Sequence, residues 1–156
     1  MMDELYREVI LDHHRSPRGR APLASPDAEA AGKNPSCGDE VTLQLAFDGE
    51  RIADASVRTH GCAIATASGS ILAELVVGRT RDEARRLAGA FREVMHDPDG
   101  ELADALDPGD LEVLTGVRKF PLRVKCALLP WITLLEAMLA DAEGRDAAEI
   151  STEEAR

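Results

Sequence analysis

Apolar and polar residues alternate along two stretches of the chain, and this alternation predicts two neighbouring strands. Every second side chain is apolar in residues 41–47, and the same period of two recurs in residues 53–59. Such a period places the apolar side chains on one face of a strand. The intervening Asp48-Gly49 is typical of a tight hairpin turn. We therefore expect an antiparallel pair in which Val41 lies opposite about Ser56.

Other stretches carry apolar residues at spacings of three and four, which is the period of an amphipathic helix. They cover residues 3–14, residues 63–77 and about residues 121–141. Residues 80–83, Thr-Arg-Asp-Glu, have the form of a capping box, in which the first and last side chains satisfy backbone N–H groups. We expect a further helix to begin there and to end at about Val94.

The segments between these elements lack a regular period. Residues 16–36 contain four prolines and two glycines, which predicts an extended or looping segment with one short edge strand. Residues 96–110 are acidic and contain two Asp-Pro turns, which predicts a loop with one short helical piece. The final residues, 143–156, are rich in charge, and we expect them to form a frayed tail.

The order of helix, strands and then helices predicts an α+β fold. We expect a small antiparallel sheet of about three strands, packed on one face by helices, in a single domain that spans residues 1–156. Aromatic residues make up only 3% of the chain, so the core must be aliphatic. Burial of aliphatic side chains at about 25 cal/mol per Å² can stabilise a domain of this length.

The net charge of −11 excludes several function classes. Nucleic-acid binding without sequence preference depends on Lys and Arg at the phosphates, and anionic membranes attract basic surfaces. The sequence contains no run of 18 apolar residues, and the first residues lack the pattern of a signal peptide. We therefore expect a cytoplasmic protein with no nucleic-acid partner and no membrane partner.

The candidate chemistry lies in three cysteines and one aspartate. An odd number of cysteines excludes a complete set of internal disulfides, and thiols in a reducing cytosol commonly serve metal binding or catalysis. Cys37 and Asp39 precede the first predicted strand, and Cys62 follows the second. Pairing of the hairpin should bring these three residues to one end of the sheet. Cys126 lies in the first turns of the last helix.

Three thiolates and a carboxylate form a ligand set that suits a tetrahedral zinc ion. Such a set carries more negative charge than one Zn²⁺ neutralises, which leaves the thiolates nucleophilic and allows one ligand to leave. Cys37 lies in a loop beside Gly38 and is the best candidate for a reactive thiol. Cys62 precedes a helix N-terminus, which lowers the pKa of a thiol. The spacing alone leaves a second interpretation open, in which the cysteines are inert thiols of the core.

Longer motifs resemble the SufU branch of the IscU-like (NifU N-terminal) family. They are residues 34–39, residues 59–68 and residues 117–126, and residues 11–19 also look like the opening of the family. The matches occur in the family's order over almost the whole chain. The resemblance implies an IscU/SufU-like fold and a sulfur-trafficking role in iron–sulfur cluster assembly. It also implies two partners, a SufS-type cysteine desulfurase that supplies persulfide sulfur and a downstream cluster scaffold.

The resemblance further implies roles for individual residues. The zinc ligands that it implies are Cys37, Asp39, Cys62 and Cys126. Cys37 matches the catalytic cysteine that accepts sulfur, and Arg123 matches a basic residue of the catalytic site that steadies a displaced thiolate. On this basis we expect the protein to be an enzyme, a zinc-dependent sulfurtransferase.

Two features distinguish the SufU branch from the IscU-like scaffolds. Those scaffolds carry histidine before the third cysteine, where this chain has Lys125, and a protonated lysine does not bind zinc. The acidic stretch at about residues 94–114 also resembles the SufU insertion. The alternative function is a scaffold on which the same ligands assemble a [2Fe–2S] cluster. A third hypothesis is a binding module whose metal only supports folding.

Three other residues have plainer interpretations. His60 adjoins Cys62 in sequence, but neighbours on a strand point to opposite faces, so we expect its side chain to face away from the metal. Trp131 lies on the apolar stripe of the last helix and is expected in the core. Pro130 cannot donate a backbone hydrogen bond to Cys126 and is expected to kink that helix.

Overall fold

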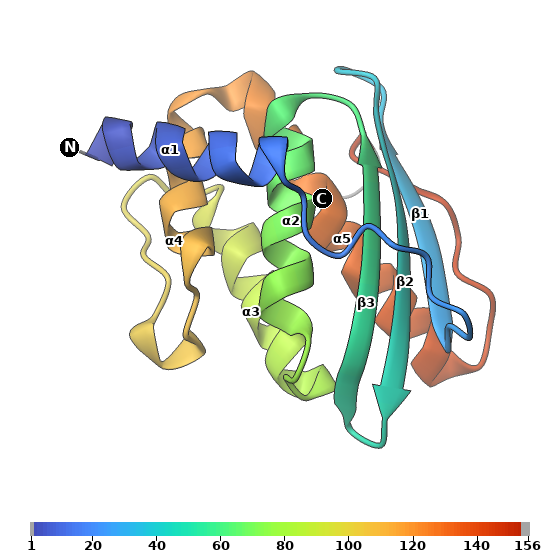
Figure 1. Ribbon diagram of the computed structural model, residues 1–156. Coiled ribbons are helices and arrows are strands. Elements are labelled where there is room, and N and C mark those ends of the chain that lie inside the picture. The colour runs from blue at the N-terminus through green and yellow to red at the C-terminus, as the bar shows by residue number, and fades with distance from the viewer. Residues whose placement is uncertain (1, 154–156) are drawn as a thin grey trace.

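The computed structural model describes residues 2–153 as a sheet covered on one face by helices (Figure 1). The helices are α1 (Met2–Arg15), α2 (Ala63–Val76), α3 (Arg81–Val94), α4 (Asp110–Leu114) and α5 (Pro121–Glu143), with short 3-10 helices η1 (Asp104–Leu106) and η2 (Thr115–Lys119). The strands are β1 (Ala28–Asn34), β2 (Asp39–Asp48), β3 (Arg51–His60) and β4 (Ile150–Ser151). Within this part of the chain, no helix combines the length and the hydropathy needed to cross a bilayer.

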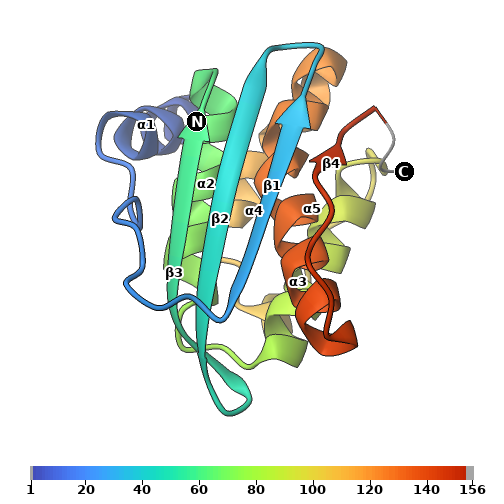
Figure 2. The same cartoon turned by 90° about the vertical axis from the view of Figure 1, so that its right-hand side faces the viewer.

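The sheet has the strand order β3-β2-β1-β4. The first three strands pair antiparallel, and β4 pairs parallel to β1. The predicted α+β class, with helices on one face, is confirmed, whereas the short parallel strand β4 was not expected. Figure 2 shows α2 and α5 behind the sheet, with the ends of β1 and β3 and the starts of β2 and α2 at the same end.

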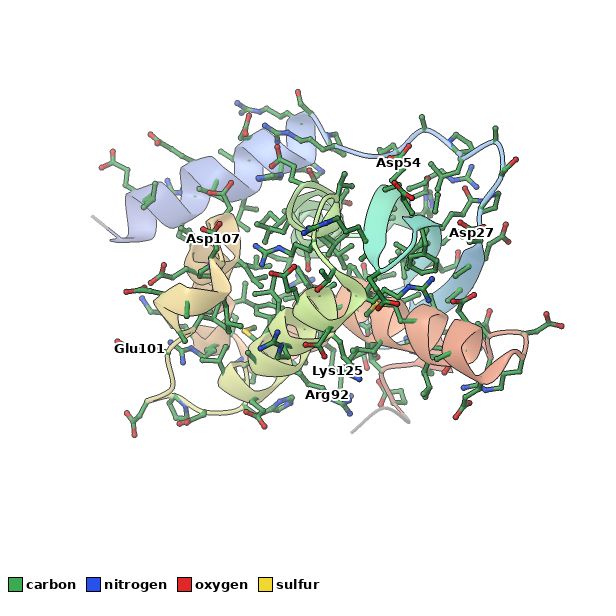
Figure 3. All side chains as sticks on the ribbon, turned by 90° about the horizontal axis from the view of Figure 1, so that it is seen from below. Asp27, Asp54, Arg92, Glu101, Asp107 and Lys125 are labelled. Carbon is green, nitrogen blue, oxygen red and sulfur yellow. The ribbon has the colours of Figure 1, made fainter. Side chains whose placement is uncertain are left out.

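The alternation in β2 determines which face of the sheet is covered. Val41, Leu43 and Leu45 are buried against the helices, and the side chain of Thr42 between them is exposed. The core is aliphatic apart from a few aromatic rings, among which Trp131 is fully buried as predicted. Figure 3 shows side chains filling the space between helices and sheet, with charged groups such as Glu101 at the outside.

The register of the β2–β3 hairpin differs from the prediction. Val41 lies opposite Thr59 rather than Ser56. The turn is formed by residues 49–50, one position later than the sequence motif suggests, and an irregularity after Ala46 adds one more residue to β3. These two effects together shift the pairing by three residues, and they extend it to the last residue of β3.

Residues 16–36 contain a seven-residue strand, β1, which lies inside the sheet between β2 and β4. The prediction of an edge strand was wrong. Burial alternates along β1, but its inward positions include alanine and Gly32 rather than large β-branched residues, so its pattern is weak. Small residues are needed there because α5 crosses β1 closely. A Cβ atom at Gly32 would overlap Oγ1 of Thr133 and lie 3.1 Å from Leu129 Cδ1.

The expectation that residues 143–156 form a frayed tail was wrong where the structure describes them. Gly144, with φ of +67°, ends α5, and the chain then turns back to place β4 beside β1. The backbone N–H of Thr152 donates to the carbonyl of Lys33 at 3.0 Å. A strand of two residues has no periodicity, so this docking could not be recognised from the sequence. Residues 154–156 lie outside the described part.

The acidic segment at residues 96–110 is a loop with one short helical piece, η1, as predicted. The guanidinium of Arg118 donates to the carbonyls of Asp97 and Gly100, each at 2.7 Å. This basic side chain therefore fastens the acidic loop to the body of the protein.

A buried histidine fastens α1 to the rest of the helical layer. His13 is 1% exposed, and its Nδ1 lies 2.7 Å from Ser70 Oγ while its Nε2 lies 2.9 Å from Asp110 Oδ2. Glu74 adds a second carboxylate at 3.6 Å. Because both ring nitrogens have partners within the protein, we assign this cluster a structural role.

Two glycine substitutions test how tightly β1 packs. Gly32→Ala should lower the free energy of unfolding by about 1–3 kcal/mol, because the new methyl group overlaps Thr133 of α5. The matched control, Gly89→Ala in α3, meets nothing within 4 Å and should stabilise the protein by about 0.5–1 kcal/mol. Urea unfolding of both variants measures the effects. Equal stabilities for the two variants would contradict the packing described.

Candidate metal centre

Three of the four predicted ligands gather where β1 ends and β2 begins. The Sγ atoms of Cys37 and Cys126 and a carboxylate oxygen of Asp39 all lie within 4.8 Å of one another. Ligand atoms bound tetrahedrally at about 2.3 Å from a zinc ion are separated by about 3.8 Å. Small side-chain movements would therefore suffice to close this group around one ion.

Cys62, the fourth predicted ligand, lies outside that group of three but contacts two of its members. Its backbone N–H donates to Asp39 Oδ1 at 2.8 Å, and its Sγ is hydrogen bonded with the thiol of Cys126. The same sulfur caps α2 by accepting from the N–H of Ala65 at 3.5 Å. The hairpin and the start of α2 thus bring Cys62 beside Asp39 and Cys126.

The thiols of Cys62 and Cys126 shift each other's pKa in opposite directions. The hydrogen bond from Cys126, supported by the N–H groups of Ala65 and Ile64 at the start of α2, lowers the pKa of Cys62 to about 6. The hydrogen bond to Cys62, followed by burial, raises the pKa of Cys126. Without a metal, Cys62 is therefore the thiolate of this pair at neutral pH.

Asp39 is held in place by its neighbours and is fully buried. One carboxylate oxygen accepts from the N–H of Cys62 at 2.8 Å, and the other accepts from Nδ2 of Asn34 at 3.1 Å. Gly61 allows this close approach, because a Cβ atom there would overlap Asp39 Oδ1 and lie 2.9 Å from Asp39 Cα.

Cys37 is the thiol on the outer side of the cluster. It lies on a tight turn in which the N–H groups of Cys37 and Gly38 donate to the carbonyl of Asn34 at 3.2 and 2.9 Å. Its Sγ lies 3.8 Å from Nη1 of Arg123 and 3.9 Å from the carbonyl oxygen of Leu122, in the first turn of α5. Contact with Cys126, together with the nearby thiol of Cys62, raises the pKa of Arg123.

The donor set fits a metal that prefers sulfur. Three thiols and one carboxylate suit zinc, and the same thiols suit iron in a cluster. The second interpretation, inert thiols of the core, does not fit Cys37 and Cys62, because both are only half-buried. The chemistry of the donors alone does not choose between zinc and iron.

Comparison with known proteins shows the family. The profile of the family described as NifU-like N terminal domain matches residues 5–127. The chain belongs to this family. The resemblance to its SufU and IscU-like members, predicted from the motifs, is confirmed.

Two curated relatives and one solved structure illustrate the match. The chain is 38% identical to the zinc-dependent sulfurtransferase SufU of Bacillus subtilis, over 92% of this chain and 95% of the relative. It is 34% identical to the iron–sulfur cluster assembly scaffold protein IscU of Streptococcus pyogenes, over 99% and 96% of the two chains. The NifU-like N-terminal crystal structure from Brucella abortus has a TM-score of 0.81 at 26% identity, covering 92% of this chain and 99% of that chain.

Two predicted details of this NifU-like site concern residues beside the cysteines. His60 is exposed and pairs across the sheet with Glu40, whose side chain is also exposed, so it faces away from the cluster as expected. Lys125 forms an ion pair with Glu153, in which Nζ and Oε2 lie 3.0 Å apart. Helix α5 continues through Pro130 to Glu143, and the kink at Pro130 stays a prediction.

Sequence reasoning missed two buried polar residues of the site. Asn34 opens one of the family motifs and is fully buried, and its amide contacts two of the predicted ligands. Thr152, the residue directly after β4, contacts the same amide. A polar residue at an inward position of β1 is the signal that could have identified Asn34, whereas Thr152 lies beyond the residues that the family profile matches.

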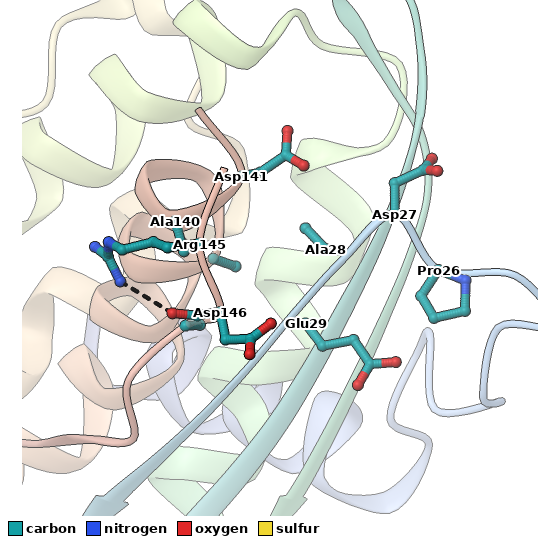
Figure 4. Close-up of a pocket in the computed structure, with 10 residues that line it drawn as sticks. Pro26, Asp27, Ala28, Glu29, Ala140, Asp141, Arg145 and Asp146 are labelled. Atoms are coloured by element: carbon teal, nitrogen blue, oxygen red, sulfur yellow. Dashed lines mark hydrogen bonds between the residues drawn. The ribbon is translucent and has the colours of Figure 1, made fainter. Parts of the chain in front are cut away.

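The hollow shown in Figure 4 is a separate feature. Its volume is about 420 Å³, and it lies between the start of β1 and the end of α5, at the opposite end of β1 from the cluster. Asp27, Glu29 and Asp141 line it together with Arg145, which donates to the carbonyl of Asp146 at 3.2 Å. None of the predicted site residues lines this hollow.

Thiol alkylation of the metal-free protein tests the opposite pKa shifts of Cys62 and Cys126. Because the pKa of Cys62 is lowered to about 6, its rate with iodoacetamide should rise through that pH and level off by about pH 7. Cys126, fully buried and with a raised pKa, should stay largely unmodified over the same range. Peptide mass spectrometry measures both rates. In denaturant both thiols should titrate near the ordinary value of about 8.5. A folded-state midpoint above 8 for Cys62 would contradict the arrangement.

Proposed function

We propose that this protein is a zinc-dependent sulfurtransferase that accepts persulfide sulfur from a SufS-type cysteine desulfurase for iron–sulfur cluster assembly. The position of Cys37 supports this most strongly. Its thiol is half-buried on a turn beside Arg123, whereas Asp39 and Cys126 are fully buried. The names of the family relatives, a zinc-dependent sulfurtransferase and a cluster assembly scaffold, agree with this class of function.

In this proposal Cys37, Asp39, Cys62 and Cys126 hold the zinc ion. Bound zinc would keep the thiols deprotonated at neutral pH and would stabilise the fold around them. Asp39 and Cys126 are fixed by burial, and Cys62 is fixed as the N-cap of α2. Cys37 is the donor that is free to exchange, because its turn lies at the surface.

The chemistry that Cys37 performs is a transfer of sulfane sulfur. The Cys37 thiolate attacks the outer sulfur of the desulfurase persulfide, forming a new S–S bond. The S–S bond of the donor breaks, and its electron pair leaves with the donor cysteine as a thiolate. The proton stays on the transferred sulfur, and no net oxidation occurs. The resulting Cys37 persulfide then delivers its sulfur to a downstream cluster scaffold.

Arg123 assists by charge. Its guanidinium lies 3.8 Å from the Cys37 sulfur, so a free Cys37 thiolate or persulfide has a permanent cation beside it. A nearby positive charge favours the ionised thiol and therefore the nucleophile. We assign Arg123 to the catalytic site on this ground.

Replacing the proposed acceptor tests the function directly. Cys37→Ala should abolish the stimulation of a SufS-type desulfurase, measured as sulfide release in the presence of a thiol reductant. Wild-type chain treated with desulfurase and cysteine should gain one sulfur atom on the peptide that contains Cys37. His60→Ala, an exposed change near the site, is the control and should stimulate like wild type. Full stimulation by Cys37→Ala would exclude the proposed role. If Cys37→Ala only lowered stability, the metal would serve folding alone.

The scaffold function is the second candidate, because three thiols also suit iron and the family includes named scaffolds. Anaerobic incubation with iron, sulfide and reductant discriminates between the two. We expect stoichiometric zinc by elemental analysis and no visible charge-transfer bands after desalting. A stable coloured protein containing two irons and two sulfides per chain would favour the scaffold.

Two substitutions of Arg123 separate charge from shape. Arg123→Ala should lower the rate of sulfur transfer to Cys37 by about tenfold, the usual effect of removing one charge-assisted contact of roughly 1.4 kcal/mol. Arg123→Lys keeps the charge but loses the planar fork, and should retain an intermediate rate. Rapid-quench mass spectrometry of the Cys37 persulfide measures the rates. Arg123 is exposed, so the melting temperature should not change. Equal rates for all three proteins would remove Arg123 from the catalytic site.

A further inference from the structure

The amide of Asn34 contacts two of the proposed ligands at once. Its Nδ2 donates to Asp39 Oδ2 at 3.1 Å and to Cys126 Sγ at 3.4 Å. An amide NH₂ group has two hydrogens, so both are used by these two acceptors. Asn34 is fully buried, and water cannot substitute for either contact.

Thr152 determines which way this amide points. Its hydroxyl donates to Oδ1 of Asn34 at 2.9 Å, and its side chain is 7% exposed. A carbonyl oxygen can only accept, so the hydroxyl must be the donor. If the amide were reversed, its oxygen would face the carboxylate of Asp39 and the sulfur of Cys126, and Thr152 would face an NH₂ group.

The segment that carries Thr152 is fixed beside the cluster by contacts on both sides. Pairing of β4 with β1 and the bond from Thr152 N–H to the Lys33 carbonyl hold its backbone. Beyond it, Glu153 accepts from Ser36 Oγ at 2.6 Å and from Lys125 Nζ at 3.0 Å. Ser36 and Lys125 immediately precede two of the cysteines in sequence. Figure 2 shows β4 beside β1 at the end of the sheet where the cluster lies.

We infer that Asn34 is a positioning residue of the metal centre and that residues 150–153 complete this centre by orienting it through Thr152. The inference rests on the proposed metal site. The two N–H groups of Asn34 act on Asp39 and Cys126, the ligands that stay, and none of the described contacts of its side chain reaches Cys37 Sγ. Donors to anionic ligands offset part of the surplus negative charge and hold the ligands at fixed positions. The arrangement therefore supports two standing ligands and leaves Cys37 free to exchange.

The test compares variants that differ by single groups. Thr152→Val removes the hydroxyl at nearly constant volume, and Asn34→Asp replaces the donor with an acceptor. Thr152→Ser restores the hydroxyl. Glu149→Gln is the matched control, because it alters an exposed ion pair with Lys33 (3.2 Å) in the same segment. Zinc affinity is measured by competition with a chromogenic chelator, and the ligand field is measured from the absorption bands of the Co²⁺-substituted protein.

We expect Thr152→Val to weaken zinc binding by about tenfold and Asn34→Asp by about a hundredfold, with a shift of the cobalt–thiolate bands in both. Thr152→Ser and Glu149→Gln should match wild type. Wild-type affinity and spectrum in Thr152→Val would overturn the inference, as would an equal loss in Glu149→Gln. If Asn34→Asp does not fold, the comparison of Thr152→Val with Thr152→Ser still decides. A wild-type protein that binds no zinc would instead contradict the proposed function.

Discussion

The arrangement at the end of the sheet depends on one buried carboxylate. Asp39 has no exposure to solvent, and a buried charge is costly unless hydrogen bonds replace the lost water. Those bonds come from the N–H of Cys62 and the amide of Asn34. They tie the start of β2 to the start of α2 and to the end of β1. Because Gly61 has no side chain, the chain can pass closely enough for this to occur.

The same contacts make the four proposed ligands unequal. Hydrogen bonds link Asp39, Cys62 and Cys126 into one group that joins β1, β2, α2 and α5. None of these three side chains can therefore move without breaking one of those hydrogen bonds. Cys37 is held by backbone bonds of its turn, and its sulfur has only weak contacts with Arg123 and the start of α5. In the proposed function, such a site retains its ion while one donor exchanges. The proposal therefore assigns stability and reactivity to different residues.

Local patterns predicted the elements well where the period was strong. The capping box that begins α3 is present as predicted, and α3 ends at Val94. The hairpin was recognised, but its register was wrong by three residues, because a two-residue turn and a bulge are decided by local backbone geometry that alternation does not encode. The four candidate ligands could be named from residue type and position, and the structure brings three of them within 4.8 Å. Their binding of a metal stays a prediction.

Polar support for the site could not be predicted in the same way. Asn34 and Thr152 are separated by 118 residues, and the alternation in β1 gives no sign that Thr152 is the partner of Asn34. The inward positions of β1 are small, because α5 crosses the strand closely, so the sequence indicated only a short edge strand within an extended or looping segment. Charged residues near the end of the chain suggested disorder, yet a few backbone bonds suffice to fix residues 150–152. Each missed feature depends on contacts between distant segments.

The docking of β4 also has a consequence for the order in which the protein is made. Synthesis from the N-terminus releases Cys37, Asp39 and Cys62 long before Cys126 and Thr152. A growing chain therefore exposes three of the four proposed ligands before Cys126 and Thr152 are present. If these residues hold the metal as proposed, the oriented Asn34 that supports it exists only after residue 152 has left the ribosome and β4 has paired with β1. In the proposed metal site, the docking of β4 thus separates the early exposure of single donors from the completed arrangement of all four.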